Sequence, residues 1–315
     1  FDKIDIGNPN WPNRTTWFGN TYPAPKSRVN MSVGCLTVDP KAGTIYVAGP
    51  DECTGLVAYR AADGRVVNSS RITPAAMAHD GTHLYMTWRN KKKKEYGLRR
   101  YSDGGKRDLT TLMSIHARDG GLDRLINRNG HCRGLAIGGG ELFVSDTPNN
   151  RIVVCSTTDW PKEKRSFPLA APHQLAFDGR TLWAVQRPNG KAKIVRLTTA
   201  GKALLELTAD IGDPRGLGVD AGGRLWVADA GPDCQVKVFA ITGTTARRLR
   251  TLGRRSGIYS GVPGKVAPDK LNHPQAVGLL PDGGVVVGAE LRDVGNHHLG
   301  TGAEIRAFTA TGKPL

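Results

Sequence analysis

Basic and imidazole side chains recur at equivalent places of a repeated segment in this chain. Six copies of the segment align, and each begins with a short apolar stretch that opens at Pro-x-Gly or a variant of it. The residue after the proline position is polar in four of the copies, as Arg133, His173, Arg215 and Gln275. Guanidinium forks and an imidazole gathered in one place can hold a carboxylate, a sulfate or a phosphate. These four residues are therefore the predicted ligand-binding set.

The repeated segments are expected to be strands. In each copy the first apolar stretch is followed by a Gly-rich turn, a second apolar stretch and a third alternating segment. The copies begin near residues 32, 73, 131, 171, 213 and 273. Units of three or four short strands cannot bury their hydrophobic faces alone, so neighbouring units must pack in a closed ring. The sequence predicts an all-β, six-bladed β-propeller that spans residues 1–315 as a single domain.

The last blade of such a ring needs an outer strand from the other end of the chain. The sixth copy stops soon after its third strand, and the chain opens with the alternating segment Phe1–Gly7. We expect residues 1–30 to supply a closing strand and an aromatic lead-in, with Phe1–Gly7 as the outer strand of blade six.

The ring geometry places the predicted ligand-binding set at one face. The start of each innermost strand lies at the same face as the end of the second strand, and functional loops gather there. A structural alternative exists for the same residues. Arg133 and Arg215 could pair with Asp213 and with loop acids such as Asp146 or Asp229, and so plug the channel.

The charge of the chain favours an anionic partner. Lys and Arg number 44 against 28 Asp and Glu, which gives a net charge of +16. Part of the excess falls in the loop after the second strand of blade two, on the predicted face, and Arg187 adds to it. The residues added to the predicted binding set are Lys91, Lys92, Lys93, Lys94 and Trp88. A positive field concentrates anionic ligands, although a lysine run is also typical of a solvated loop.

The repeats resemble the NHL repeat, most closely in blades three and five. The matching residues of blade five are Pro214, Gly216, Asp220, Gly223, Trp226, Val227, Ala228 and Asp229, and blade three matches over Gly134–Ala136 and at Val144, Asp146 and Asn149–Ile152. The resemblance covers nearly the whole chain after residue 31. It implies a six-bladed propeller, whose relatives include peptide-amidating lyases, gluconolactonase-like hydrolases, strictosidine synthase-like enzymes and RNA-binding domains. It is specific for the fold and almost silent on function.

Two kinds of metal site follow from this resemblance. Residues 172–176, Pro-His-Gln-Leu-Ala, are similar to the segments through which amidating lyases place zinc-binding histidines. Those enzymes need histidines at the equivalent position of three blades, whereas His131 and His273 lie out of phase with His173. Bent strand starts could still gather the three histidines. A gluconolactonase-like calcium site would draw on Asp146, Asn149, Asp229, Asp233 and Glu290, but acids at these positions also bond turn backbone. We therefore predict no cofactor, with Zn or Ca as the alternative.

The five cysteines include one pair that could form a bridge. Cys35 opens the first strand of blade one and Cys53 follows its second strand, so the two lie at the same end of an antiparallel pair. A disulfide there is geometrically reasonable and suits an exported protein, periplasmic or extracellular. The alternative is that the cysteines are small buried hydrophobes in a reducing compartment.

These observations predict a module that binds an anionic ligand, an acidic or sulfated polysaccharide or another polyanion, at its basic face. One alternative is a metal-dependent lyase or hydrolase around His173, although no nucleophile with a base and an orienting group is visible. Another is an RNA-binding NHL domain. A protein partner or additional domains are compatible with the chain, and no apolar run reaches the length of a membrane span.

Overall fold

A computed structural model describes residues 15–18, 33–49, 56–70, 74–90, 95–102, 106–107, 114–115, 132–160, 162–262, 267–290 and 302–315. These residues form six small sheets and three single-turn 3-10 helices, η1 (Thr147–Asn149), η2 (Pro188–Gly190) and η3 (Gly257–Tyr259). No helix in this part of the chain is long and apolar enough to cross a membrane.

Each sheet is one blade, and its strands succeed one another from the inside of the ring outward. Blade one contains β2 (Cys35–Val38), β3 (Thr44–Ala48), β4 (Leu56–Arg60) and β5 (Val66–Ser70). Blade two contains β6 (Met77–His79), β7 (His83–Asn90), β8 (Glu95–Ser102) and β10 (Ser114–Ile115), with β9 (Lys106–Arg107) also paired to β8. Blade three contains β11 (Cys132–Gly138), β12 (Glu141–Asp146), β13 (Arg151–Ser156) and β14 (Glu163–Pro168).

The remaining blades follow the same order. Blade four contains β15 (Pro172–Phe177), β16 (Thr181–Gln186), β17 (Lys193–Thr198) and β18 (Ala203–Leu207). Blade five contains β19 (Pro214–Val219), β20 (Leu225–Asp229), β21 (Gln235–Thr242) and β22 (Thr245–Leu252). Blade six contains β23 (Pro274–Leu279), β24 (Val285–Glu290), β25 (Gly302–Phe308) and β1 (Thr15–Phe18).

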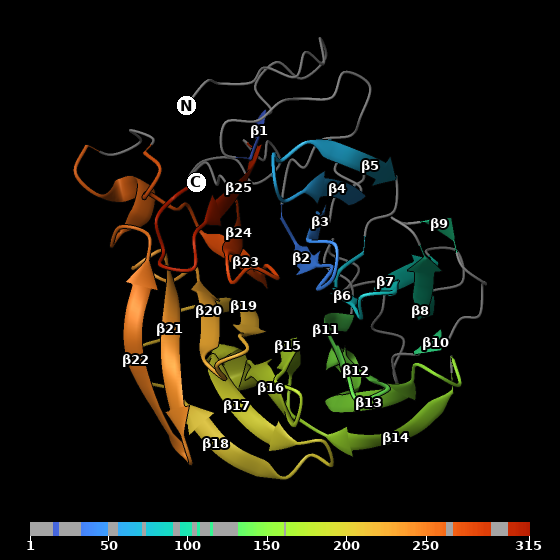
Figure 1. The fold of residues 1–315 in the computed structure, drawn as a ribbon. Helices are drawn as coiled ribbons and strands as arrows, with labels where there is room; N and C mark the ends of the chain where they lie inside the picture. Colours follow the sequence, from blue (N-terminus) through green and yellow to red (C-terminus); the bar gives the residue numbers. More distant parts are fainter. Residues whose placement is uncertain are drawn as a thin grey trace.

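The six innermost strands close a ring. Each inner strand contacts the next one, in the order β2, β6, β11, β15, β19 and β23, and β23 contacts β2 again. Figure 1 shows these strands around the centre of the molecule, with the later strands of each blade farther out. The prediction of an all-β, six-bladed β-propeller is confirmed.

An N-terminal strand completes blade six, as predicted, but it is formed by other residues. The strand β1, Thr15–Phe18, runs parallel to β25 and pairs Thr15 with Gly302 and Phe18 with Ile305. The expectation that Phe1–Gly7 takes this outer position was wrong, and those residues lie outside the described part of the chain. The β-branched and aromatic residues of Thr-Thr-Trp-Phe favour a strand as strongly as the alternation of the first seven residues does.

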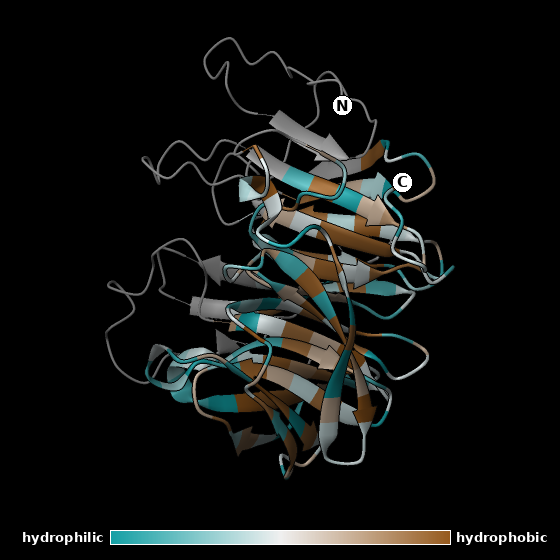
Figure 2. Ribbon diagram, turned by 90° about the vertical axis from the view of Figure 1, so that its left-hand side faces the viewer, coloured by the Kyte–Doolittle hydropathy of each residue, from teal (hydrophilic) through white to brown (hydrophobic). Residues whose placement is uncertain are grey.

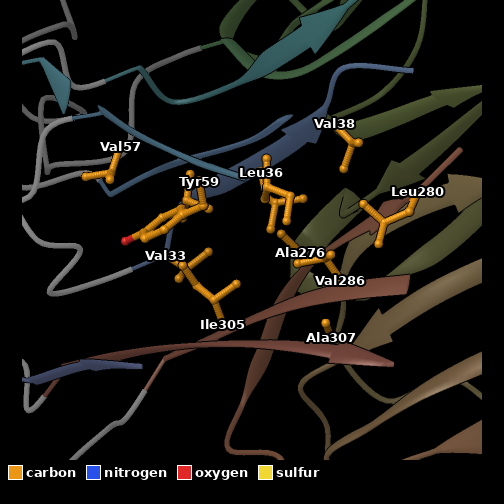
Figure 3. Packing of buried hydrophobic residues seen from close by; sticks show 12 residues of the cluster. Val33, Leu36, Val38, Val57, Tyr59, Ala276, Leu280, Val286, Ile305 and Ala307 are labelled. Carbon is orange, nitrogen blue, oxygen red and sulfur yellow. The ribbon is translucent and has the colours of Figure 1, made fainter. Parts of the chain in front are cut away.

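Hydrophobic clusters lie between the blades and hold the ring together. Each of six clusters draws its side chains from two adjacent blades. Figure 3 shows the cluster between blades one and six, where Leu36 and Tyr59 face Val286 and Ile305. In Figure 2 hydrophobic residues gather along the stacked strands, and several connecting loops are hydrophilic. Because burying one such side chain contributes about 1.5–3 kcal/mol, the clusters dominate the cohesion of the fold.

A recurring aspartate shapes the turn between the first two strands of a blade. In blade four, Asp178 Oδ1 accepts the backbone N–H of Thr181 at 2.6 Å, and its Oδ2 accepts Trp183 Nε1 at 3.2 Å. In blade five, Asp220 Oδ2 accepts Trp226 Nε1 at 2.8 Å. The carboxylates that bond turn backbone in blades one, two and six are Asp39, Asp80 and Asp282. The acid before the Gly-rich turn is therefore explained by turn formation, since Asp side chains favour such bonds.

Cys35 carries a free thiol, so the expected disulfide to Cys53 is not formed. The Cys35 Sγ is buried and donates to the carbonyl of Pro74 at 3.5 Å. Burial raises the pKa of this thiol, which keeps it protonated and unreactive. Cys53 lies outside the described residues. The alternative reading of a small buried hydrophobe holds for Cys35.

Candidate functional site

Four inner strands carry a β-bulge where they begin. The register shifts fall between Cys132 and Leu135, Pro172 and Leu175, Pro214 and Gly216, and Pro274 and Ala276. Arg133, His173, Arg215 and Gln275 lie inside these shifts, together with Gly134 and Gln174. A bulge bends the strand and re-aims its side chain, which is why bulges are common beside functional sites. The four predicted residues therefore occupy the same place in their blades, at the start of the inner strand, where the backbone departs from regular strand geometry.

Blades three and four touch closely at this level. A Cβ atom on Gly134 would lie 2.1 Å from the carbonyl oxygen of His173, so only glycine fits there. The Ser145 hydroxyl donates to the same carbonyl, and Thr147 Oγ1 donates to the carbonyl of Pro172 at 2.6 Å. These contacts fix the start of β15 against blade three. They place the backbone of His173 against Gly134, the residue that follows Arg133.

One carboxylate ties two arginines together. Asp213 Oδ1 accepts Arg187 Nη2 at 2.5 Å, and Asp213 Oδ2 accepts Arg215 Nε at 2.7 Å and Nη2 at 2.6 Å. Arg187 Nη2 also donates to the carbonyl of Pro214 at 2.7 Å. Burial opposes ionisation of Asp213, but the two guanidinium groups outweigh it and lower the pKa of this carboxyl. The pairing of Arg215 with Asp213 is the one that the structural alternative expected.

Arg133 differs from its neighbours because none of the described residues supplies its counter-charge. Among the described residues no acceptor forms a hydrogen bond or an ion pair with its half-buried guanidinium. Burial lowers the pKa of Arg133, and the positive charges of Arg215 and Arg187 lower it further. Asp146, a proposed partner, instead accepts Arg151 Nε at 2.7 Å.

We call Arg133, His173, Arg187, Asp213 and Arg215 the mouth cluster. It holds three guanidinium groups and one carboxylate.

His173 is a neutral imidazole inside the mouth cluster. Burial lowers its pKa to about 3, and the positive charges of Arg133, Arg187 and Arg215 act in the same direction. The carboxylate of Asp213 opposes them but does not compensate. At neutral pH the imidazole is therefore uncharged and can accept or donate one hydrogen bond.

Lowering the pH is expected to destabilise the fold through His173. Its pKa falls from 6.5 to about 3 on folding, so between these values the unfolded chain takes up a proton that the folded protein excludes. Stability from this group is complete above pH 6.5 and decreases by up to about 1.4 kcal/mol per pH unit below it. Urea midpoints between pH 7 and about pH 4 should therefore fall more steeply for the parent than for His173→Gln. Equal slopes would contradict the buried, neutral state of His173.

The remaining described inner-strand candidate, Gln275, is hydrogen-bonded within blade six. Its Nε2 donates to the carbonyl of His273 at 3.2 Å, and its side chain is buried. The His273 Nδ1 lies 2.6 Å from Asn272 Oδ1, and its ring stands 6.4 Å from that of Tyr259. Blade six thus contributes hydrogen-bonding groups, and the connection before it contributes an aromatic ring.

The histidine candidates for zinc are not assembled into a site in the part of the chain described. His131 falls outside that part, and His273 is engaged by Asn272 and Tyr259. The described residues contain no group of three or more His, Cys, Asp or Glu side chains arranged to hold a metal ion.

The acids considered for calcium have other partners. Asp229 is fully buried and accepts the backbone N–H of Gly212 at 2.8 Å and of Asp213 at 2.6 Å. Both Asp229 and Asp233 also accept Lys237 Nζ, at 2.8 and 2.9 Å. Asn149 Nδ2 donates to Asp146 rather than joining an oxygen set, and the side chain of Glu290 is outside the described part. Turn bonding and ion pairing account for these acids.

The lysine run and Trp88 remain predictions. Lys91–Lys94 connect β7 to β8 but lie outside the described residues, as does the side chain of Trp88. Arg187, by contrast, was only a general contributor to the basic face in the sequence, and the structure places it within the mouth cluster. Tyr259 was not predicted at all. Its signal was that it is the only aromatic residue of the Gly-rich and basic connection into blade six.

Several solved structures share the fold. A structural genomics protein of unknown function from Bacteroides thetaiotaomicron matches with a TM-score of 0.60 at 14% identity, over 92% of this chain and 72% of that one. A putative 6-phosphogluconolactonase from Bacteroides uniformis gives 0.55 at 15%, over 90% and 84%. Catalytically inactive virginiamycin B lyase from Staphylococcus aureus with quinupristin gives 0.53 at 13%, over 93% and 86%.

These similarities show a β-propeller. Identities this low show the fold alone, and activity does not follow from it. No protein-family model matches the chain, and no curated protein does.

Proposed function

We propose that this protein is a binding module for an anionic ligand, held by the mouth cluster. The observation that carries the proposal is Arg133, a half-buried guanidinium that has no counter-charge among the described residues and whose pKa is lowered by the positive charges of two further arginines. Like charges held together in a partly desolvated place repel each other, and an anion relieves that repulsion. A bound carboxylate, sulfate or phosphate would occupy the place of the missing counter-charge.

The geometry of the cluster suits such a ligand. Asp213 already fixes the guanidinium planes of Arg187 and Arg215 through short hydrogen bonds, so little ordering remains to be done on binding. No described residue accepts a hydrogen bond from Arg133, so within that part of the chain its N–H donors are available for a fork-like contact. The net charge of +16 adds a long-range field that speeds the encounter with a polyanion.

The proposal extends to an acidic or sulfated polysaccharide, with RNA as the alternative polyanion. NHL-type repeats remain our interpretation of the sequence, and the aspartate-capped turns of five blades fit that repeat. The prediction of export was based partly on a disulfide that Cys35 does not form. Export therefore stays a prediction, and it now rests on the proposed polysaccharide ligand.

A second candidate function is catalysis around His173. Its imidazole is neutral and stands beside three guanidinium groups, an arrangement that can take a proton from a substrate whose negative charge the arginines stabilise. Binding ranks above it, because no other described group of the mouth cluster is a ready proton donor to a leaving group. Turnover of a bound anion that disappears in His173→Gln would favour the enzyme.

Arg133→Gln tests the proposed function directly. The probes are heparin, polygalacturonate and poly(U), measured by titration calorimetry at low salt. Loss of one charge-assisted fork is expected to weaken the probe that the parent binds by roughly 10- to 100-fold. The matched control is Arg247→Gln, which removes the same charge from the exposed outer strand β22. Equal affinity in both variants would sink the proposal.

A further inference from the structure

We propose that the ligand is an acidic sugar, and that Tyr259 is the platform on which its ring stacks while the mouth cluster holds its charged group. The inference rests on the proposed function and adds the chemical class of the ligand. Its charged group is a carboxylate or a sulfate, which arginine forks accept alike. Sugar sites combine one apolar face with a few fixed polar groups, and both are present here.

Tyr259 leaves an aromatic ring open to solvent. Its exposed fraction is 47%, and it is the only aromatic among the exposed large hydrophobic side chains of the described residues. Val262, which follows on the same loop, is 65% exposed. Two apolar side chains on one basic loop are therefore free to contact a ligand.

The turn that carries Tyr259 is rigidly built. Gly257 opens η3 at a φ of +45°, and a Cβ there would lie 1.9 Å from the carbonyl oxygen of Leu271. The backbone N–H of Ile258 donates to that same carbonyl at 3.0 Å, and Leu271 is fully buried. Ser260 Oγ closes the turn by donating to the carbonyl of Gly257 at 2.8 Å. The ring is thus presented from a fixed support, which lowers the entropic cost of stacking.

The rest of the loop is pinned on both sides of the turn. Arg254 Nη2 pairs with Asp269 at 2.8 Å, and its backbone N–H donates to the carbonyl of Asp269 at 2.5 Å. Lys270 Nζ donates to the carbonyl of Val262 at 3.1 Å. The described residues on both sides of the turn, 254–262 and 269–270, are therefore held in place.

A short chain of contacts joins Tyr259 to the mouth cluster. The rings of Tyr259 and His273 meet edge-on, at 6.4 Å and 89°, and the carbonyl of His273 accepts Gln275 Nε2. Gln275 occupies the bulge of blade six. On the neighbouring strand, a Cβ on Gly216 would lie 2.7 Å from Ala276 Cα, so the residues before them, Arg215 and Gln275, are neighbours in the ring. Tyr259 is thus linked to the arginines through His273 and Gln275.

A sugar fits this surface better than RNA does. Proteins that bind single strands stack successive bases on several aromatic side chains. The described residues offer one exposed ring beside one compact group of three arginines, which matches a single ring with one charged substituent.

The test compares Tyr259→Ala, Tyr259→Phe and Arg133→Gln with the parent, using polygalacturonate and heparin oligosaccharides, inorganic sulfate and poly(U). Tyr259→Ala should weaken the glycan that binds by about tenfold, while Tyr259→Phe stays within about twofold. Sulfate binding should be the same in Tyr259→Ala and the parent, since the ion has no ring to stack. Because heparin carries uronates as well as sulfates, binding of polygalacturonate shows that a carboxylate suffices, and binding of heparin alone shows that sulfate is required.

The outcomes separate the two proposals. If Arg133→Gln weakens glycan binding and Tyr259→Ala does not, the anion site stands and the sugar platform is overturned. If neither variant changes binding, the proposed function fails as well. Binding of poly(U) that depends on Tyr259, with no binding of either glycan, would overturn the sugar assignment. Unchanged thermal midpoints of the variants show that a loss of affinity is not a loss of fold.

Discussion

An Arg133→Ala/Arg215→Ala double variant is expected to bind heparin or poly(U), whichever the parent binds, at least about 100-fold more weakly. Arg133 supplies a fork that no residue in the described part of the chain engages, and Arg215 supplies a fork oriented by Asp213. The fold should survive, because the interblade clusters rather than the mouth hold the blades together. Affinities at about 50 and about 200 mM salt, with the thermal midpoint of each variant, check both statements.

The lysine run provides the contrasting variant. Replacing Lys91–Lys94 by glutamine should lower the association rate and flatten the salt dependence, by up to about one unit of slope per lysine. The residual affinity at high salt should stay close to that of the parent. An unchanged affinity in the double arginine variant, at both salt concentrations and for every polyanion that the parent binds, would reduce the mouth cluster to a structural plug.

The blades could be predicted from the sequence because each repeat encodes its own local geometry. Strand segments such as Leu225–Asp229 are apolar and fully buried. In five of the blades an aspartate before the Gly-rich turn fixes the hairpin that joins the first two strands. Six incomplete hydrophobic faces then leave little choice except mutual packing. The closing strand could not be predicted equally well. Both Thr15–Phe18 and Phe1–Gly7 have the residue pattern of a strand. The strand that pairs with β25 is Thr15–Phe18, and the alternation of side chains along a strand does not indicate which segment makes that pairing.

The mouth cluster was predictable in part for a related reason. Aligned repeats located Arg133, His173 and Arg215, because equivalent positions of a propeller meet around one axis. The partners of these residues depend on the loops, which differ from blade to blade. Arg187, on the loop after β16, pairs with Asp213. Arg133 has no counter-charge among the described residues. Neither fact follows from residue types and spacing alone.

Tyr259 shows the same limit. Its place beside the mouth follows from η3 and the backbone bond of Ile258 to Leu271. The sequence marks the segment only as a Gly-rich and basic connection, and nothing in such a composition indicates which side chain is presented to solvent.

Lys237→Met is expected to lower the free energy of unfolding by about 3–5 kcal/mol. Lys237 Nζ is buried between the carboxylates of Asp229 and Asp233, at 2.8 and 2.9 Å. Burial alone would lower the pKa of Lys237, but hydrogen bonds to the two carboxylates raise it, so the amine is charged. Without this cation the fully buried Asp229 keeps three backbone N–H donors and loses its counter-charge.

The matched control for this variant is Lys193→Met, whose amine pairs with the exposed Glu206 at 2.6 Å and should contribute less than about 1 kcal/mol. Adding Asp229→Asn to Lys237→Met should recover part of the loss, because the uncompensated charge is then gone. Urea midpoints of the four proteins decide the matter, and equal midpoints for the two lysine variants would contradict it. The pair also reaches the mouth, since Asp229 accepts the backbone N–H of Asp213. Lys237→Met should therefore weaken anion binding even under conditions in which the variant stays folded, because Asp213 orients Arg187 and Arg215.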